Sequence, residues 1–389
     1  MANFDFDVTV EQLRRKRGVK WNKYGPDALG AWVADMDFPV AEPIQRALTR
    51  AVEMNDLGYS FKSKEGPIPE LFAERAMRRY GWRVAPNLVE GMCDVVQGLY
   101  VTIANFSAPG ASVVTLTPVY PPFLNAVREN ERYLIEHELR PQDDYRLDLE
   151  RLGRDIRADT ELLLLCNPHN PTGRVFLRDE LVGIAELAER HDLTVLADEI
   201  HADLVYSGHQ HIPFATLSPE TAARTITMTS ATKSYNIAGL RYAVAAFGSE
   251  ALAARYNQIP ERLRGGMNSF GVLATEAAWS ECDDWLDALV VYLEANRDFA
   301  LDTIRRDFPG VNLKSPEATF LMWLNCGGLN LPPDPHRFFL ERAGVGLSDG
   351  IDFGRGGAGH VRLNFATSRQ VLERILGQMG EALAARNER

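Results

Sequence analysis

Residues 161–197 constrain the fold of this chain more than any other part of its sequence. They begin with the continuous apolar run 162–166 (LLLLC), which is typical of a strand buried on both faces. Residues 178–191 then place apolar side chains at helical spacing between charged ones, and 194–197 form a second apolar run. A strand, a helix and a strand in this order predict a right-handed βαβ crossover with parallel strands.

Similar runs on both sides extend this pattern. Further strands are predicted at residues 112–116, 225–229 and 242–247. Alternating strands and helices predict an α/β fold, with a large and mostly parallel sheet flanked by helices. The C-terminal part instead combines helical patterns with strand-like runs, at residues 285–308, 320–324, 360–365 and 369–385. We interpret it as a smaller α+β domain.

These patterns divide the chain into three predicted parts. Residues 46–283 form the large domain, and residues 284–389 form the small C-terminal domain. Residues 1–45 carry little regular pattern, so we expect them to lie across the boundary between the two domains.

The overall charge is acidic, with 53 Asp and Glu against 42 Lys and Arg and a net charge of -11. An acidic surface repels phosphate backbones and anionic lipids, so neither nucleic acid nor a membrane is an expected partner. No apolar run approaches the roughly 20 residues of a membrane-spanning helix, and the first residues lack the pattern of a signal peptide. The four cysteines are scattered and form no CxxC pair, which indicates reduced thiols. We therefore expect a cytoplasmic protein.

Polar side chains follow several predicted strands, which is where ligands bind in open α/β sheets. An amide, a carboxylate, an amine and a guanidinium occur at such places: Asn170, Asp198, Lys233 and Arg241. Each alone is more often a solvated charge or part of a turn. Together they match a pyridoxal phosphate site, which needs an amine for a Schiff base, an acid for the pyridine nitrogen and donors for the phosphate.

With these residues the sequence resembles the fold-type I pyridoxal phosphate enzymes of the class I/II aminotransferase superfamily. Within it, the likeness is to the cystathionine β-lyase branch (MalY/PatB type) and covers nearly the whole chain. The motifs that carry it are 32–38 (WVADMDF), 117–123 (TPVYPPF), 167–173 (NPHNPTG), 198–201 (DEIH) and 233–240 (KSYNIAGL). The first and fourth indicate the branch, because aminotransferases usually carry Tyr where DEIH has His. The resemblance implies a seven-stranded, aspartate aminotransferase-like large domain.

The resemblance implies a cofactor, pyridoxal 5′-phosphate, and a role for each motif residue. Lys233 would be the catalytic residue that binds the cofactor as a Schiff base and removes the Cα proton. Asp198 would keep the pyridine nitrogen protonated, and Asn170 would bind the 3′-oxygen. His201 would support this network from below, and Tyr120 would stack on the ring. The phosphate would bind Ser230, Arg241, the backbone amides near Leu99 and Tyr100, and Tyr59 of the other subunit.

The same resemblance implies the binding site of an amino-acid substrate. Arg362 would bind the α-carboxylate, since its planar fork suits a carboxylate better than a lysine does. The alternative for this residue is an ordinary edge-strand charge. Ala34 would offer its backbone N–H, with Trp32 and Asn170 beside it. Because Tyr59 comes from the other subunit, a homodimer would be the working unit, with residues 1–45 near its interface. No metal ion is expected.

The branch implies a C–S β-lyase that cleaves an L-cysteine S-conjugate to a thiol, pyruvate and ammonia. The conjugate would be cystathionine-like or a natural-product S-cysteinyl compound. The same residues also serve transamination, so an aminotransferase stays open. Relatives in natural-product pathways, such as lincosamide biosynthesis, instead couple decarboxylation to oxidative deamination. A regulatory protein that keeps the fold is the non-enzyme alternative, which the intact Lys233, Asp198 and Arg362 argue against.

Some residues depart from the branch, and some motifs have a simpler interpretation. Gln97 and Tyr100 stand where small or aliphatic residues are expected, and Ala231 and Thr232 replace the usual Pro-Ser before the lysine. The glycine-rich residues 354–359 precede a strand, unlike a phosphate loop. The remaining features are interpreted as a solvated basic stretch (14–17), a surface turn rather than a metal site (His209 and His211) and core aromatics (Trp279 and Trp285).

Overall fold

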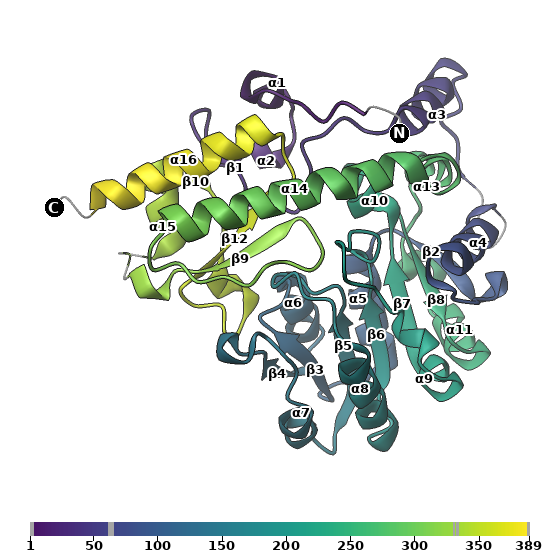
Figure 1. The fold of residues 1–389 in the computed structure, drawn as a ribbon. Coiled ribbons are helices and arrows are strands. Elements are labelled where there is room, and N and C mark those ends of the chain that lie inside the picture. Colours follow the sequence, from purple (N-terminus) through teal and green to yellow (C-terminus); the bar gives the residue numbers. More distant parts are fainter. Residues whose placement is uncertain (1–3, 61–65, 330, 332–333, 387–389) are drawn as a thin grey trace.

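The computed structural model describes residues 4–60, 66–329, 331 and 334–386 (Figure 1). At its centre is a seven-stranded sheet in the order β2-β8-β7-β6-β5-β3-β4, in which only β8 is antiparallel to its neighbours. The strands are β2 (Val89–Met92), β3 (Ser112–Thr117), β4 (Tyr133–Glu138), β5 (Thr160–Cys166), β6 (Thr194–Asp198), β7 (Thr225–Thr229) and β8 (Ala243–Phe247). The predicted α/β fold with a large, mostly parallel sheet is confirmed.

Helices cover both faces of this sheet, which explains its continuous apolar strands. In β5, Leu162 and Leu164 pack under one set of helices, whereas Leu163 and Leu165 pack under another. The first set is α5 (Val95–Phe106), α6 (Pro121–Glu129) and α11 (Glu250–Asn257). The second set includes α7 (Leu149–Asp155) and α8 (Arg178–Arg190). The next helix along the chain is the short α9 (Pro219–Ala223).

The C-terminal part has the predicted mixture of helices and antiparallel strands. Its three-stranded sheet, in the order β11-β12-β9, is built from β9 (Leu321–Asn325), β11 (Ser348–Asp349) and β12 (His360–Asn364). The long helix α14 (Asp283–Asp307) packs beside α16 (Arg369–Arg386), and the short α15 (Pro335–Phe338) lies near β12. The domain boundaries at residues 46 and 284 stay predictions.

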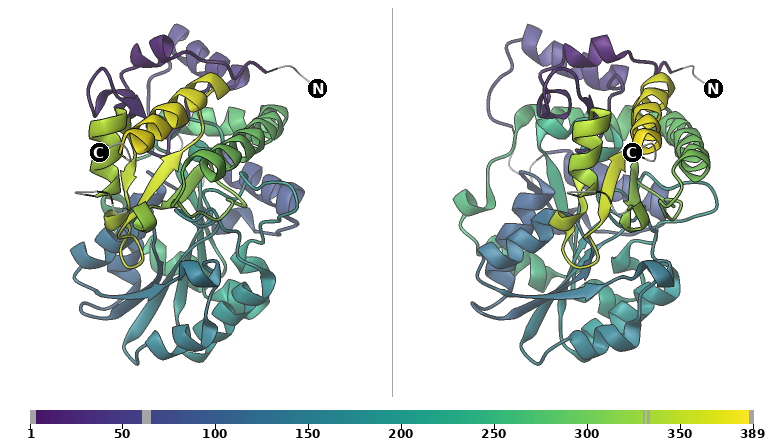
Figure 2. Two further views of the ribbon diagram at one scale, coloured as in Figure 1. Left: turned by 60° about the vertical axis from the view of Figure 1, so that its left-hand side comes forward. Right: turned by 90° about the vertical axis from the view of Figure 1, so that its left-hand side faces the viewer.

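The N-terminal segment contacts both parts of the molecule. Its strand β1 (Leu29–Gly30) pairs with β10 (Val345–Gly346), and α3 (Glu42–Glu53) packs on α13 (Ser269–Glu281). Figure 2 shows this segment lying beside α16 in both views. The remaining helices are α1 (Val10–Arg14), α2 (Val19–Asn22), α4 (Ile68–Tyr80), α10 (Ala231–Ser234) and α12 (Glu261–Arg264).

Most of the simpler interpretations agree with the structure. Trp279 and Trp285 are buried in the core, residues 14–17 are exposed, and residues 354–359 form a loop before β12. The surface-turn interpretation was wrong for His211, although His209 is exposed. The His211 ring is buried, and its Nε2 lies 3.0 Å from the buried carboxylate of Glu199. Among the described helices, none is long and apolar enough to cross a membrane.

Candidate active site

A cavity of about 550 Å³ lies at the carboxyl ends of the central strands. Because parallel strands end at the same edge of the sheet, residues far apart in sequence meet there. Asn170 follows β5, Asp198 ends β6, and Lys233 lies in α10 directly after β7. The predicted residues that line this cavity are Ala34, Tyr100, Tyr120, Asn170, Asp198, His201, Lys233 and Arg241.

Lys233 is directed into the cavity by a sharp turn after β7. The turn is fixed by Ser230, whose hydroxyl caps α10 by accepting the N–H of Thr232 at 3.0 Å. The Lys233 Nζ donates to the carbonyl oxygen of Ala34 at 2.6 Å. Burial lowers the pKa of this amine, and the Arg362 charge lowers it further against the opposing effect of Asp35. A lowered pKa increases the neutral fraction of the amine, which is the nucleophilic and basic form.

Asp198 and His201 carry perturbed pKa values of opposite kinds. Burial raises the pKa of Asp198 to about 7, and the charge of Glu199 adds to this effect. Burial also lowers the pKa of His201 to about 3, together with the charges of Lys233 and Arg362. The site therefore holds a neutral imidazole beside a carboxyl group that lacks a full countercharge. The protonated pyridine nitrogen of a bound cofactor would supply that countercharge.

The start of α5 forms another side of the cavity. Asp94 caps this helix, since its carboxylate accepts the N–H of Gln97 at 2.8 Å. Val95 and Val96 line the cavity, and N–H groups in a first turn have no partner within their helix. The structure thus corrects the expected amide donors. Leu99 is fully buried in the core, and its N–H lies a turn inside the helix, as does that of Tyr100.

Two further phosphate-binding candidates differ in where they lie. Ser230 does not line the cavity, and its hydroxyl donates to the carbonyl of Tyr242 and accepts from the N–H of Thr232. Thr232 lines the cavity instead, which the sequence had shown only as a departure from the usual Pro-Ser. Arg241 does line it, with an exposed side chain 3.8 Å from Asp94.

A second cavity, of about 470 Å³, adjoins the first and shares Ala34, Tyr120 and Lys233 with it. Trp32 and Arg362 line this second cavity.

Arg362 is buried, with only neutral acceptors bound to its guanidinium. Its Nη1 donates to Asn170 Oδ1 at 2.9 Å. Its Nη2 donates to the Trp32 carbonyl at 2.9 Å and to Ser348 Oγ at 3.1 Å. Burial lowers the pKa of Arg362 to about 10, so it stays charged at neutral pH. A charged guanidinium whose hydrogen-bond partners are all neutral still lacks a counterion, which a carboxylate can supply.

Residues 32–38, the WVADMDF motif, are held in place by partners that the sequence did not indicate. Asp37 forms a buried ion pair with Lys20 at 2.9 Å. Asn364 of β12 donates to the carbonyls of Val33 and Asp35, and Asn236 donates to that of Phe38. The motif therefore bridges the end of α10 and the small sheet.

The two departures from the branch have defined contacts. The Tyr100 hydroxyl donates to Glu129 at 2.7 Å, and burial together with Glu129 raises the pKa of Tyr100 to about 12. Gln97 donates through Nε2 to the carbonyls of Leu263 and Arg264, at 3.2 and 2.9 Å. Gln97 thus fastens α12 to the rim of the first cavity.

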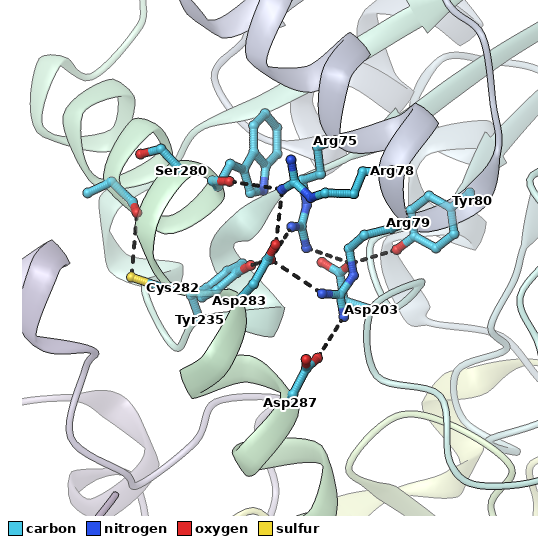
Figure 3. Close-up of polar contacts among 12 residues, drawn as sticks. Arg75, Arg78, Arg79, Tyr80, Asp203, Tyr235, Ser280, Cys282, Asp283 and Asp287 are labelled. Atoms are coloured by element: carbon cyan, nitrogen blue, oxygen red, sulfur yellow. Dashed lines mark hydrogen bonds and ion pairs between the residues drawn. The ribbon is translucent and has the colours of Figure 1, made fainter. Parts of the chain in front are cut away.

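A network of arginine and aspartate side chains lies beside α10 (Figure 3). Arg75 of α4 is buried and donates to Asp203 at 2.8 Å and to Asp283 at 2.7 Å. Tyr235, two residues after Lys233, lies 5.7 Å from this guanidinium. Burial alone would raise the pKa of Asp203, but Arg75 and Arg79 lower it to about 2. These contacts tie α4, α10 and α14 together.

Comparison with known proteins identifies the family. The family model for class I and II aminotransferases matches residues 73–379. The chain belongs to this family.

Individual relatives cover almost the whole chain. The cystathionine beta-lyase PatB of Bacillus subtilis is 35% identical, over 98% of this chain and 100% of its own length. The crystal structure of OvoB matches with a TM-score of 0.92 and 40% identity, over 98% of this chain and 99% of that one. The PLP-bound C-S lyase from Staphylococcus hominis matches with a TM-score of 0.91 and 28% identity, over 98% and 99%.

Proposed function

We propose that this protein is a pyridoxal phosphate-dependent C–S lyase. It cleaves an L-cysteine S-conjugate, with one water molecule, to a thiol, pyruvate and ammonia. The observation that carries this proposal is the likeness to PatB, a cystathionine beta-lyase 35% identical over 98% of this chain. The two cavities support it, because Lys233 and Asp198 line the first cavity, and Lys233 and Arg362 line the second.

The residues of the first cavity fit pyridoxal phosphate. A buried amine, Lys233, and a buried carboxyl group, Asp198, line the same cavity, and burial raises the pKa of the carboxyl group. The N-terminal turn of α5, with Arg241 beside it, suits a phosphate group. When bound, pyridoxal phosphate supplies an aldehyde that captures amino groups and a ring that accepts the electron pair left at Cα.

Lys233 is the proposed base that removes the Cα proton. Its lowered pKa favours the neutral amine, and it lines both cavities, so it would lie between a cofactor in the first and a substrate in the second. Asp198 would hold its negative charge against the pyridine nitrogen of the cofactor and so keep that nitrogen protonated. Loss of the proton from Cα then allows a thiolate on Cβ to leave.

Arg362 is the proposed binding residue for the substrate α-carboxylate. Its partner Asn170 accepts the Arg362 hydrogen bond through Oδ1, so Asn170 Nδ2 is oriented to donate to a cofactor oxygen. The Trp32 carbonyl and Ser348 hold the other side of the guanidinium. One hydrogen-bonded chain thus couples substrate binding to cofactor orientation.

The experiment that tests this function measures products from L-cystathionine without an added oxo acid. We expect pyruvate and homocysteine in equal amounts. A strict requirement for 2-oxoglutarate would replace the lyase proposal with an aminotransferase. An aldehyde with carbon dioxide, detected by mass spectrometry, would indicate oxidative deamination instead.

We also propose a homodimer whose active site is shared. Tyr59, the expected phosphate-binding residue from the other subunit, is fully exposed, and nearby Met54 and Leu57 are largely exposed as well. Co-expression of Lys233→Ala and Tyr59→Ala chains tests this directly. Mixed dimers should regain activity, because one of their two sites holds both intact residues. Activity no higher than that of the separate variants would contradict a shared site.

We propose a cytoplasmic location, with a small amino-acid substrate and no nucleic-acid partner. All four cysteines lie within the described residues and carry free thiols, as in a reducing compartment. Fractionation of cells that express the protein tests the location.

A further inference from the structure

Two consecutive acidic residues at the end of β6 lie on different sides of the sheet edge. Asp198 lines the first cavity, whereas Glu199 is buried and lines a separate small cavity of about 20 Å³. Successive side chains along a strand point to opposite faces, so these two carboxyl groups face different parts of the interior. The proposed chemistry uses Asp198 and gives Glu199 no role.

Two donors hold the Glu199 carboxylate in place. The N–H of Phe214 donates to its Oε1 at 2.8 Å, and His211 Nε2 lies 3.0 Å from its Oε2. The other ring nitrogen of His211, Nδ1, is buried and has no hydrogen-bond partner among the described residues. A protonated ring would bury an unpaired Nδ1–H, so the arrangement fits a neutral His211 that donates through Nε2. Glu199 then keeps a full negative charge in the interior.

Arg75 also lines the small cavity, but its charge is paired with other acids. Its guanidinium donates to Asp203 at 2.8 Å and to Asp283 at 2.7 Å. Asp203 lines the small cavity too, so the wall that faces Glu199 carries charges of both signs. Within the part of the chain that the structure describes, no arginine or lysine forms an ion pair with Glu199. The neighbouring charges therefore leave that of Glu199 largely uncompensated.

The charge of Glu199 acts on Asp198. Burial raises the pKa of Asp198 most, the charge of Glu199 raises it further, and that of Lys233 opposes both. The imidazole of His201 in the same cavity stays neutral, because burial lowers its pKa to about 3. A negative charge that repels a carboxylate also attracts a cation placed against that carboxylate. Two hydrogen bonds fix Glu199, so this attraction comes from a fixed place.

We propose that Glu199 and His211 are positioning residues for the cofactor, which fix a negative charge behind Asp198 that stabilises the protonated pyridine nitrogen. Asp198 touches that nitrogen, whereas Glu199 acts on it from outside the cavity. This inference rests on the proposed contact between Asp198 and the cofactor ring. A protonated ring accepts the electron pair from Cα more readily, so Glu199 raises kcat without binding the substrate.

Glu199→Gln tests the proposal, because it removes the charge and keeps the size of the side chain. Its amide can still accept from Phe214 and can donate to His211, whose ring then carries its proton on Nδ1. The holoenzyme is loaded with pyridoxal phosphate that is isotopically labelled at the ring nitrogen, whose NMR chemical shift reports its protonation. In the variant we expect this nitrogen to lose its proton at lower pH than in the wild type. At alkaline pH, kcat should fall by about threefold to tenfold while KM changes little.

Further variants distinguish the charge of Glu199 from its structural contacts. His211→Lys places an ammonium against Glu199 and should shift the titration of the ring nitrogen in the same direction as Glu199→Gln. His211→Gln keeps a neutral donor there, so the titration should stay as in the wild type. Glu180→Gln is the matched control, because it removes a buried carboxylate that pairs with Arg174 outside both substrate-side cavities. It should lower stability and leave the titration unchanged.

The cofactor-free protein provides a second measurement. At alkaline pH, Asp198→Asn should stabilise the Glu199→Gln protein less than it stabilises the wild type, because the repulsion between the two carboxylates is already absent. Urea denaturation of the wild type, both single variants and the double variant measures this difference. An equal gain in both backgrounds would show that the charge of Glu199 does not reach Asp198, and would overturn the proposal.

The remaining outcomes are equally distinct. An unchanged titration in both Glu199→Gln and His211→Lys would overturn the proposal and leave a purely structural pair. Proton loss at higher pH in His211→Gln would overturn it too, because His211 would then be protonated and cancel the charge of Glu199. A titration unaffected by Asp198→Asn would refute the contact on which the inference rests. If cystathionine gave no pyruvate but Glu199→Gln still shifted the titration, the lyase function would fail and this inference would stand.

Discussion

Two clusters of buried charge in this molecule show opposite electrostatics. In the network around Arg75, each charge meets an opposite one, and the pKa of Asp203 falls to about 2. In the cavity, burial of the Asp198 carboxyl group outweighs the nearby Lys233 charge, and the pKa of Asp198 rises to about 7. The same residue types are thus stabilised as ions in one place and destabilised in the other.

This contrast distinguishes the charges that stabilise the fold from those that take part in the proposed chemistry. Paired charges hold α4 against α14 and the turn at Asp203, and removing Arg75 takes away the buried partner of both aspartates. Unpaired charges mark places where a ligand completes the site, because only binding supplies the missing countercharge. The four predictions below test this difference between the Arg75 network and the cavity, with the largest expected effect first.

Lys233→Ala should lower pyruvate formation by at least about a thousandfold, because it removes both the proposed attachment point of the cofactor and the proposed base. The bound cofactor's visible absorption should change, while thermal stability changes little. Lys20→Met gives the reverse pattern, since Lys20 is ion-paired with Asp37 and lies outside both cavities. Spectra, product assays and melting curves measure both variants. Near-normal turnover by Lys233→Ala would refute the assignment.

Asp198→Asn should stabilise the cofactor-free protein more as pH rises. The folded pKa is raised from 3.8 to about 7, so the wild type loses stability between these pH values and no further above them. The full difference in unfolding free energy is on the order of 4 kcal/mol. Urea denaturation at several pH values measures it. A difference that does not depend on pH would contradict an unpaired Asp198, and bound cofactor should reduce the slope.

Arg75→Met and Arg362→Met compare the two clusters directly. Arg75→Met should lower the unfolding free energy by about 3 kcal/mol, because it leaves Asp203 and Asp283 short of a buried partner. Arg362→Met should change stability far less, since its partners are neutral, and should instead raise KM strongly. Denaturation and steady-state kinetics on both variants test this. Equal losses of stability would remove the distinction.

Asp94→Asn should tighten binding of the cofactor by about threefold to tenfold. The carboxylate lies at the proposed phosphate site, where like charges repel, and asparagine preserves the helix cap. Arg241→Ala should weaken binding by a similar factor. Equilibrium dialysis against pyridoxal phosphate measures both. Weaker binding by Asp94→Asn would place the phosphate elsewhere.

Much of the fold could be predicted from the sequence, because its signals are local. The apolar run 162–166 and the helical pattern after it became β5 and α8 with nearly the predicted bounds. Motif residues at strand ends could likewise be brought to one edge, since sheet topology determines where Asn170, Asp198 and Lys233 lie.

What the sequence did not reveal depends on contacts between distant residues. The partners of Asp37 and Arg362 come from other elements, and no local pattern indicates them. The expectation that the amide of Leu99 binds the phosphate could have been corrected from the local sequence. Asp94 before an apolar run is typical of a helix cap, which places the free amides at Val95 and Val96. Burial of His211 depended on Glu199, which only the folded chain brings near.

The bridge between Trp32 and Arg362 spans 330 positions of the chain. During synthesis the tryptophan leaves the ribosome early, whereas the arginine arrives almost at the end. A nascent protein can therefore complete the strands that line the cofactor cavity well before the proposed substrate-binding arginine has been synthesised. Premature termination anywhere before β12 yields a product without Arg362, the proposed carboxylate-binding residue, however well its larger sheet has formed.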